Sequence, residues 1–101
     1  MPKVVVSRKT SNPAKDSFDK ICKMLETDKE LRKLDPKYAC TFNEASLSGS
    51  AKGSQFKADM KIKDLGDGAE VEIVVDLPFH LALAKGMVEK TLKKKIEEAL
   101  S

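Results

Sequence analysis

One stretch of the chain decides the fold: residues 56–77 read FKADMKIKDLGDGAEVEIVVDL. Apolar and polar residues alternate on both sides of the central DLGDG, with the period of two that is typical of a half-buried β-strand. The inward-facing positions are Phe56, Ala58, Met60 and Ile62 before the centre, and Val71, Ile73, Val75 and Leu77 after it. The two glycines of DLGDG supply the backbone freedom of a tight turn. The stretch therefore predicts an antiparallel hairpin with one apolar face.

Side-chain chemistry also predicts the register of this hairpin, if residues 65–68 form a four-residue loop. The register then pairs Lys63 with Glu70, Lys61 with Glu72, Lys57 with Asp76, Ile62 with Val71, and Met60 with Ile73. A slip by one residue would place every apolar side chain opposite a polar one. Each exposed charge pair contributes only ~0.2–1 kcal/mol. Burial of the apolar face is therefore expected to supply the stability, while the charges select the register.

A long amphipathic helix is predicted to follow this hairpin, beginning at Pro78. Its apolar residues recur at spacings of three and four, in a stripe made of Leu81, Ala84, Val88, Leu92, Ile96 and Ala99. Glu89 and Lys93 form a pair four residues apart in the favoured orientation. A helix of ~22 residues would extend ~33 Å, enough to cross a small sheet.

The N-terminal part of the chain predicts a short strand and then a second amphipathic helix. Residues 4–6 are three valines, a β-branched run that favours a strand. Residues 11–13 read Ser-Asn-Pro, a helix-start signal, because Ser or Asn can cap orphan N–H groups and Pro suits the first helical position. The end of this helix is left open between Glu26 and Leu34, with Pro36 as the latest stop.

Two weaker strands are predicted between that helix and the hairpin, at residues 38–42 and 46–51. Residues 49–53 read GSAKG; they lack the spacing of a phosphate-binding loop and are interpreted as a hairpin turn. The element order is therefore β-α-β-β-β-β-α in one domain spanning residues 1–101. It predicts an α+β fold in which an antiparallel sheet carries two helices on one face, helix-grip-like because of the long C-terminal helix.

Composition narrows the function classes. The 101 residues include 19 basic and 16 acidic ones, and a net charge of +3 does not call for nucleic acid or a membrane as partner. No apolar run approaches the ~20 residues of a transmembrane helix, and no signal peptide is recognisable, so we expect a cytoplasmic protein. Cys22 and Cys40 are expected to be buried free thiols, with a disulfide as the alternative.

No catalytic, cofactor-binding or metal-binding set is predicted. The only histidine, His80, lies in the first turn after Pro78, and no nucleophile motif accompanies it. A general base needs a partner that orients it and a group on which to act. His80 is therefore interpreted as an ordinary residue of a helix start, and the chain is not expected to be an enzyme.

The C-terminal helix offers two candidate interaction surfaces. Phe79, Leu83 and Met87 form an apolar flank beside the core stripe. They either complete the core or contact a second copy of the chain, an apolar ligand or a granule surface. The second surface consists of Lys90, Lys93 and Lys94, which could contact an anion. Glutamates surround these lysines and no aromatic residue is interleaved for base stacking, which favours a solvated face.

The C-terminal half also carries a family resemblance. Residues 71–79, VEIVVDLPF, followed by LAKGMVE at residues 83–89, resemble the bacterial polyhydroxyalkanoic acid system proteins. These are small proteins named for genes near polyhydroxyalkanoate granule loci. The resemblance covers most of the chain, brings no catalytic residues, and implies a cytoplasmic protein associated with a granule or a granule protein.

Three functions follow as hypotheses. The first is a non-enzymatic accessory protein of polyhydroxyalkanoate metabolism that acts through an apolar surface. The second is a small helix-grip binder that holds an apolar ligand between the sheet and the C-terminal helix. The third is a binder of anionic surfaces or nucleic acid that uses the lysine-rich helix face.

Overall fold

A computed structural model describes residues 3–27, 29, 33, 37–54, 56–77 and 83–100 of the chain. In chain order the elements are β1 (Lys3–Thr10), α1 (Ala14–Thr27), β2 (Ala39–Asn43), β3 (Ser48–Lys52), β4 (Lys57–Asp64), β5 (Ala69–Asp76) and α3 (Lys85–Leu100). This order confirms the predicted α+β fold with its β-α-β-β-β-β-α sequence. The predictions made for Leu31, Leu34, Pro36, Pro78, Phe79, His80 and Leu81 lie outside the described residues.

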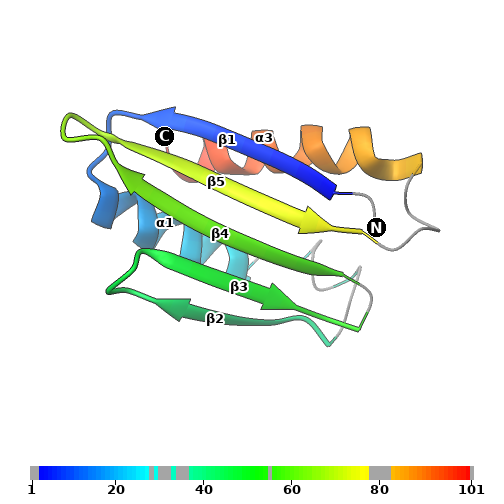
Figure 1. The fold of residues 1–101 in the computed structure, drawn as a ribbon. Coiled ribbons are helices and arrows are strands. Elements are labelled where there is room, and N and C mark those ends of the chain that lie inside the picture. Colours follow the sequence, from blue (N-terminus) through cyan, green and yellow to red (C-terminus); the bar gives the residue numbers. More distant parts are fainter. Residues whose placement is uncertain are drawn as a thin grey trace.

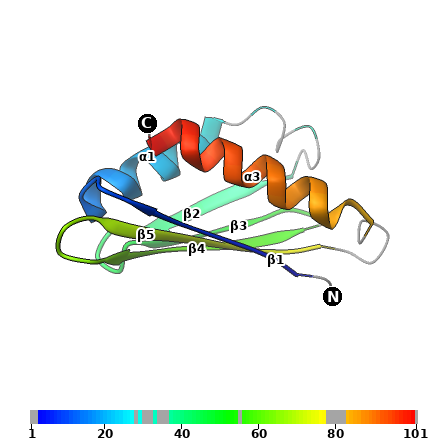
Figure 2. The same cartoon turned by 90° about the horizontal axis from the view of Figure 1, so that it is seen from above.

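The strands form one antiparallel sheet of five strands in the order β1-β5-β4-β3-β2 (Figure 1). Both described helices lie on the same face of this sheet, which gives the molecule two layers (Figure 2). We call the face toward the helices the inner face and the opposite one the outer face. The core lies between the layers, where alternate residues of each strand meet the apolar sides of α1 and α3.

The central hairpin has the register that the side chains predict. Its pairs include Lys63 with Glu70, Lys61 with Glu72, Lys57 with Asp76, Ile62 with Val71, and Met60 with Ile73. The loop occupies residues 65–68, where Gly66 has a φ of 86°, a left-handed conformation that favours glycine. The Gly66 N–H donates to Asp64 Oδ1 at 2.8 Å, which tightens the turn.

Two elements differ in length from the prediction. β1 extends from Lys3 to Thr10 rather than over residues 4–6, because it pairs along its whole length with β5. Backbone pairing does not require apolar side chains, so the charged residues of an edge strand can join it. The α-helical part of α3 begins at Lys85 rather than Pro78, after a 3₁₀ turn at Leu83 and Ala84. It spans 16 residues, about 24 Å.

The two helices cover different strands. α1 packs over β4, β2 and β5, whereas α3 packs against β1 and the side of α1. Two contacts fix the C-terminal part of α3 to the start of the chain. Asn12 Nδ2 donates to the Leu100 carbonyl oxygen at 2.7 Å, and Arg8 forms an ion pair with Glu97 at 2.6 Å. None of the helices that the structure describes has the length and apolar character that a bilayer crossing requires.

Candidate functional site

The two halves of α3 differ in burial. Leu92, at the middle of the helix, and Ile96, in its C-terminal half, are 4% and 0% exposed and close the core. Leu83, just before the first turn, is 103% exposed, and Met87 in that turn is 73% exposed. The hypothesis that this flank completes the core is therefore wrong for Leu83 and Met87. Phe79, the third residue of the predicted flank, lies outside the described residues.

The position of α1 explains this difference. The second half of α3 lies beside α1, whereas its first half extends past the region that α1 covers (Figures 1 and 2). A helix with one neighbouring helix and one strand beneath it buries side chains only where those neighbours reach it. The first half of α3 lacks the second neighbour, so a side chain there can be apolar and still face solvent.

The exposed apolar residues share one side of the helix with two lysines. Met87, Lys90 and Lys94 are spaced by three and four residues, which places them in one row of α3, and Leu83 precedes them in the 3₁₀ turn. We call these four residues the α3 stripe. Its beginning is apolar and its end is basic, and all four residues are exposed. The two surfaces predicted separately on this helix thus meet in one continuous feature.

The structure separates Lys93 from the other two lysines of the predicted anion contact. Lys93 pairs with Glu89 at 3.5 Å, which confirms the predicted pair four residues apart. This pair lies on the flank of α3 that also carries Glu97, the partner of Arg8. No ion pair to Lys90 or Lys94 is found among the described residues. A contact with an anion would therefore use Lys90 and Lys94 rather than Lys93.

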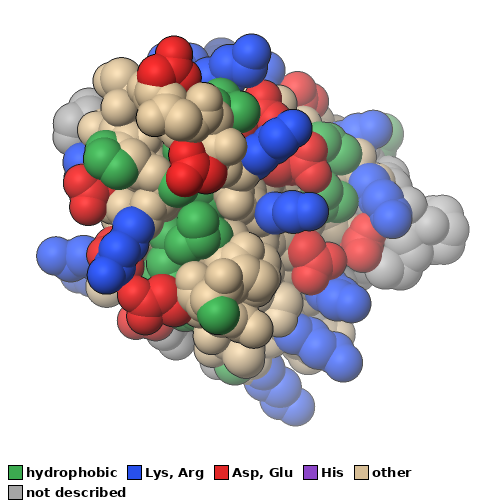
Figure 3. All heavy atoms as spheres, turned by 60° about the vertical axis from the view of Figure 1, so that its left-hand side comes forward, with side chains coloured by type: hydrophobic (Ala, Val, Ile, Leu, Met, Phe, Trp, Pro, Cys, Tyr) green, Lys and Arg blue, Asp and Glu red, His purple; other side chains and the backbone are tan. Residues whose placement is uncertain are grey.

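The end of the molecule that holds the β4–β5 loop shows no basic field. Figure 3 shows that Lys and Arg side chains alternate there with Asp and Glu, and that apolar side chains are scattered. Interspersed charges of both signs do not create the single-sign potential that attracts nucleic acid. The charge distribution on this face agrees with the small net charge.

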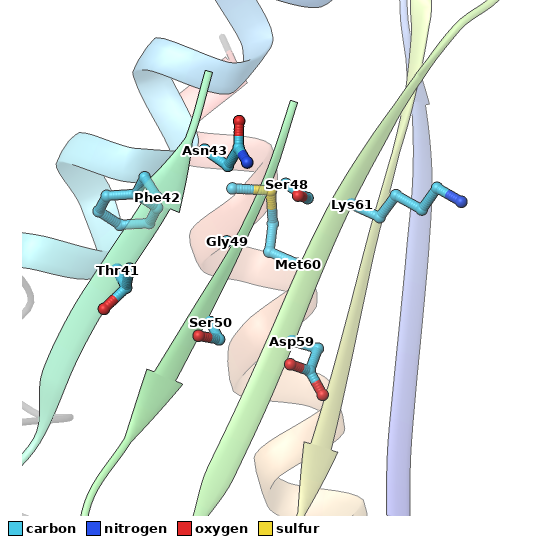
Figure 4. Close-up of a pocket in the computed structure, with 9 residues that line it drawn as sticks. All are labelled: Thr41, Phe42, Asn43, Ser48, Gly49, Ser50, Asp59, Met60 and Lys61. Carbon is cyan, nitrogen blue, oxygen red and sulfur yellow. The ribbon is translucent and has the colours of Figure 1, made fainter. Parts of the chain in front are cut away.

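A hollow of about 420 Å³ lies over β2, β3 and β4 (Figure 4). Three cross-strand rows line it: Thr41, Ser50 and Asp59; Phe42, Gly49 and Met60; and Asn43, Ser48 and Lys61. The first and third rows point to the outer face, because residues of a strand alternate between faces. β3 contributes only serines and a glycine, so the larger side chains of β2 and β4 stand as walls.

The sequence did not predict this hollow. The strand predicted at residues 46–51 overlaps β3, but the interpretation of residues 49–53 as a hairpin turn is wrong, because residues 49–52 pair with both β2 and β4 inside β3. Gly49 is required there: a Cβ would lie 2.5 Å from Cδ1 of Phe42, whose ring covers the glycine. A run of small residues between two alternating strands was the available signal, since a strand of small side chains leaves the sheet surface low.

Most side chains that line the hollow are polar, although the surface that it exposes is mainly apolar. Ser48 Oγ already shares a hydrogen bond with Ser46 Oγ at 2.6 Å, and Asn43 Oδ1 accepts from the Ser46 N–H. Asp59 and Lys61 lie on adjacent rows, each exposed to solvent. Within the described part of the chain, no group of three or more His, Cys, Asp or Glu residues could hold a metal ion. The hollow therefore offers hydroxyl, amide and charged groups that can contact a bound molecule.

The cysteines are free thiols, half-buried rather than buried. Partial burial, with smaller contributions from the nearby Glu26 and Asp19 carboxylates and from Cys40, raises the pKa of the Cys22 thiol to about 11. Cys40 Sγ donates to the Leu25 carbonyl oxygen at 3.8 Å. A nucleophilic thiol needs a lowered pKa, so Cys22 has the opposite character.

The similarity of this chain to known proteins is a similarity of fold. No protein-family model and no curated protein matches the chain. Among solved structures it is similar to the di-domain ARO/CYC BexL from the BE-7585A biosynthetic pathway, with a TM-score of 0.71 and 10% identity, covering 99% of this chain. The chain spans 45% of the length of BexL.

Two further structures match over nearly their full length. A START superfamily protein from Mycobacterium smegmatis has a TM-score of 0.63 and 11% identity, covering 97% of this chain and 96% of that one. Ara h 8.0201 has a TM-score of 0.56 and 12% identity, with 98% and 97% covered. The neighbours are helix-grip proteins, so the helix-grip-like arrangement expected from the sequence is the fold of this chain.

Proposed function

We propose that this chain is a cytoplasmic, non-enzymatic accessory protein of bacterial polyhydroxyalkanoate metabolism that attaches to the polyester granule through the α3 stripe. The resemblance of residues 71–89 to polyhydroxyalkanoic acid system proteins suggests the setting. The observation that carries the mode of attachment is the exposure of Leu83 and Met87 on a helix whose other end is buried.

The stripe matches the chemistry of a polyester surface. Aliphatic side chains of the polymer offer an apolar contact for Leu83 and Met87, and ester carbonyl oxygens accept hydrogen bonds from the ammonium groups of Lys90 and Lys94. Full burial of a Leu or Met side chain contributes ~1.5–3 kcal/mol. Two such side chains correspond to an affinity near the millimolar level before the lysines contribute. The attachment is therefore weak for one molecule and reversible.

Co-sedimentation with amorphous polyhydroxybutyrate particles stripped of protein tests this proposal. The variant Leu83→Asp/Met87→Asp is expected to lose at least about tenfold in bound fraction, since ~1.4 kcal/mol is already tenfold. Leu65→Asp is the matched control, because Leu65 is an exposed apolar residue in the β4–β5 loop, away from the stripe. Wild-type protein that stays in the supernatant, or a double variant that binds like wild type, contradicts the proposal.

A parallel experiment with anionic phospholipid vesicles distinguishes granule attachment from binding to an anionic surface. Binding to polyester particles that survives 0.5 M salt, with weak binding to vesicles, supports the apolar contact, because salt screens charge attraction. Binding to vesicles alone, abolished by Lys90→Glu/Lys94→Glu, would favour the anionic-surface function instead.

A second candidate function is the binding of an apolar ligand between the sheet and α3. The helix-grip fold favours it, since the chain shares this fold with a START superfamily protein. Against it, Leu92 and Ile96 occupy the space between α3 and the sheet, and the hollow over β3 lies on the outer face. A ligand that binds only the folded state raises Tm, so decanoate titrated in a thermal unfolding assay tests it. An unchanged Tm at millimolar decanoate removes this candidate.

A further inference from the structure

The two edges of the sheet are built differently. β1 ends the sheet on one side and carries Lys3, Arg8 and Lys9. β2 ends it on the other side and reads ACTFN, with neither a charge nor a proline. Natural proteins protect edge strands with charges, prolines or a covering element, because an open edge presents unpaired N–H and C=O groups to other strands. β2 therefore lacks the protection that charges and prolines give to an edge strand.

No described element lies beyond β2 (Figure 1). Along this strand Ala39, Thr41 and Asn43 are exposed on the outer face, while Cys40 and Phe42 face inward and are half-buried. Phe42 contacts the Phe18 ring of α1 edge-to-face at a centroid distance of 6.3 Å, so its inner side is ordered by the core. The edge is thus uncharged and held in place by the core, which are properties of a pairing surface.

We propose that β2 pairs antiparallel with β2 of a second copy of this chain, about a two-fold axis at Thr41, so that the two sheets become continuous. An isologous contact of this kind closes on itself and stops at a dimer. The pairing extends over five residues, about 17 Å of edge. It does not involve the α3 stripe and stands or falls independently of the proposed granule contact.

The side chains of β2 are complementary to themselves in this register. Thr41 lies opposite Thr41 of the other copy, Cys40 opposite Phe42, and Ala39 opposite Asn43, so inward residues meet inward residues and no charges face each other. The same operation on β1, centred on Val6, places Lys3 opposite Lys9 and Val4 opposite Arg8. Like charges directly opposite are destabilising. Like charges therefore disfavour this register of β1, whereas the corresponding register of β2 brings no charges together.

The hollow gives this pairing a consequence. Thr41 and Asn43 are its wall on the β2 side, and they are also the outer-face residues of the edge. Joining two copies at β2 places two hollows on either side of one seam. The dimer would then present the two hollows on one outer face, separated by the Thr41 and Asn43 side chains of both copies and opposite the helices that carry the α3 stripes.

An engineered disulfide tests the register directly. In a Cys22→Ser/Cys40→Ser background, Thr41→Cys places one thiol opposite its own copy at a Cα separation of about 4.5–5.5 Å, within the reach of a disulfide. Val5→Cys is the matched control. Val5 and Thr41 are the two ends of the same outer-face row, through Val74, Asp59 and Ser50, and both are exposed.

Oxidation with glutathione disulfide at about 50 μM protein is expected to give the covalent Thr41→Cys dimer at least about tenfold faster than the Val5→Cys dimer, since two residues held opposite react as an intramolecular pair. Equal rates for the two variants overturn the proposal.

Sedimentation equilibrium of proteins with both native cysteines gives an independent measurement. Wild type and Val5→Lys are expected to dimerise reversibly, whereas Thr41→Lys, which sets two ammonium groups on the axis, remains monomeric with an unchanged circular dichroism spectrum. A wild-type monomer at every concentration overturns the proposal, as does a Thr41→Lys dimer. A dimer that Leu83→Asp/Met87→Asp dissolves would assign the contact to the α3 stripe and likewise overturn it.

Discussion

The two helices lie on the same face of the sheet and are of similar length, yet they are used differently. α1 buries residues along its whole length, at Ala14, Ser17, Phe18, Ile21 and Leu25. α3 has two more residues than α1 and buries only Leu92 and Ile96. The core thus uses the whole of α1, whereas on α3 it takes Leu92 and Ile96, with Val88 packed against it.

This difference between the helices shows which apolar side chains the core of this small domain does not require. About 100 residues allow a single core with little excess, so most apolar side chains are required inside. An exposed Leu83 and Met87 in such a chain are conspicuous, because neither contributes burial to the fold. Leu83 and Met87 can therefore be changed without loss of structure. That is the property on which the proposed granule contact depends.

Alanine substitutions in the two helices give the largest expected effect. Ile21→Ala and Ile96→Ala remove side chains that are completely buried and should each lower the free energy of unfolding by ~2–5 kcal/mol. Leu83→Ala should change it by less than about 0.5 kcal/mol, since its side chain is fully solvated. Urea unfolding followed by circular dichroism measures all three. A loss for Leu83→Ala as large as that for Ile96→Ala would return the first half of α3 to the core.

The same contrast shows what could be predicted from the sequence. The hairpin register was predictable because Lys and Glu alternate with apolar residues on both strands, so only one alignment satisfies both patterns. The buried positions Leu92 and Ile96 follow from helical spacing alone. These are local patterns, and each can be read from the spacing of residues along the chain.

The exposure of Leu83 and Met87 could not be predicted in this way. Spacing shows which residues share a side of a helix, but it does not show how far a neighbouring helix extends, and that depends on tertiary packing. The hollow was missed for a related reason: residues 49–52 are small and polar, typical of a turn, and are strand only because β2 and β4 pair with them. Context overrode a weak local preference.

The second largest effect concerns the contact that fixes the buried end of α3. Asn12→Ala removes the hydrogen bond from Nδ2 to the Leu100 carbonyl oxygen and should lower the free energy of unfolding by about 1 kcal/mol. Ser11→Ala is the control, one residue earlier and exposed. Amide hydrogen exchange should accelerate in the last turn of α3 and not in its first turn. An equal acceleration of amide hydrogen exchange along the whole of α3 would mean that this hydrogen bond stabilises both ends of the helix equally.

A smaller effect, an increase in stability rather than a loss, is expected for a substitution at Gly86 in the first turn of α3. No described atom lies within 4 Å of a Cβ placed there, so Gly86→Ala should raise stability by about 0.4–1 kcal/mol through the backbone entropy of the unfolded chain. Thermal unfolding should show a rise in Tm of a few degrees. Gly49→Ala is the contrasting variant, because its Cβ meets the Phe42 ring, and it should lower Tm. A lower Tm for Gly86→Ala would reveal a packed neighbour at the start of α3.

The smallest effect is a change in stability at alkaline pH. It distinguishes α1 from α3, because it depends on the thiol of Cys22 in α1. The pKa of Cys22 rises from 9.0 to about 11 on folding, so the folded state disfavours the thiolate. Its contribution to stability is complete below pH 9 and is lost as pH rises through 11. The stability difference between wild type and Cys22→Ser should therefore shrink between pH 9 and 11. Met87→Ser removes a non-titrating side chain from the exposed half of α3, and its difference from wild type should stay constant over the same range. A shrinking difference for Met87→Ser would show that the alkaline change is global and not centred on α1.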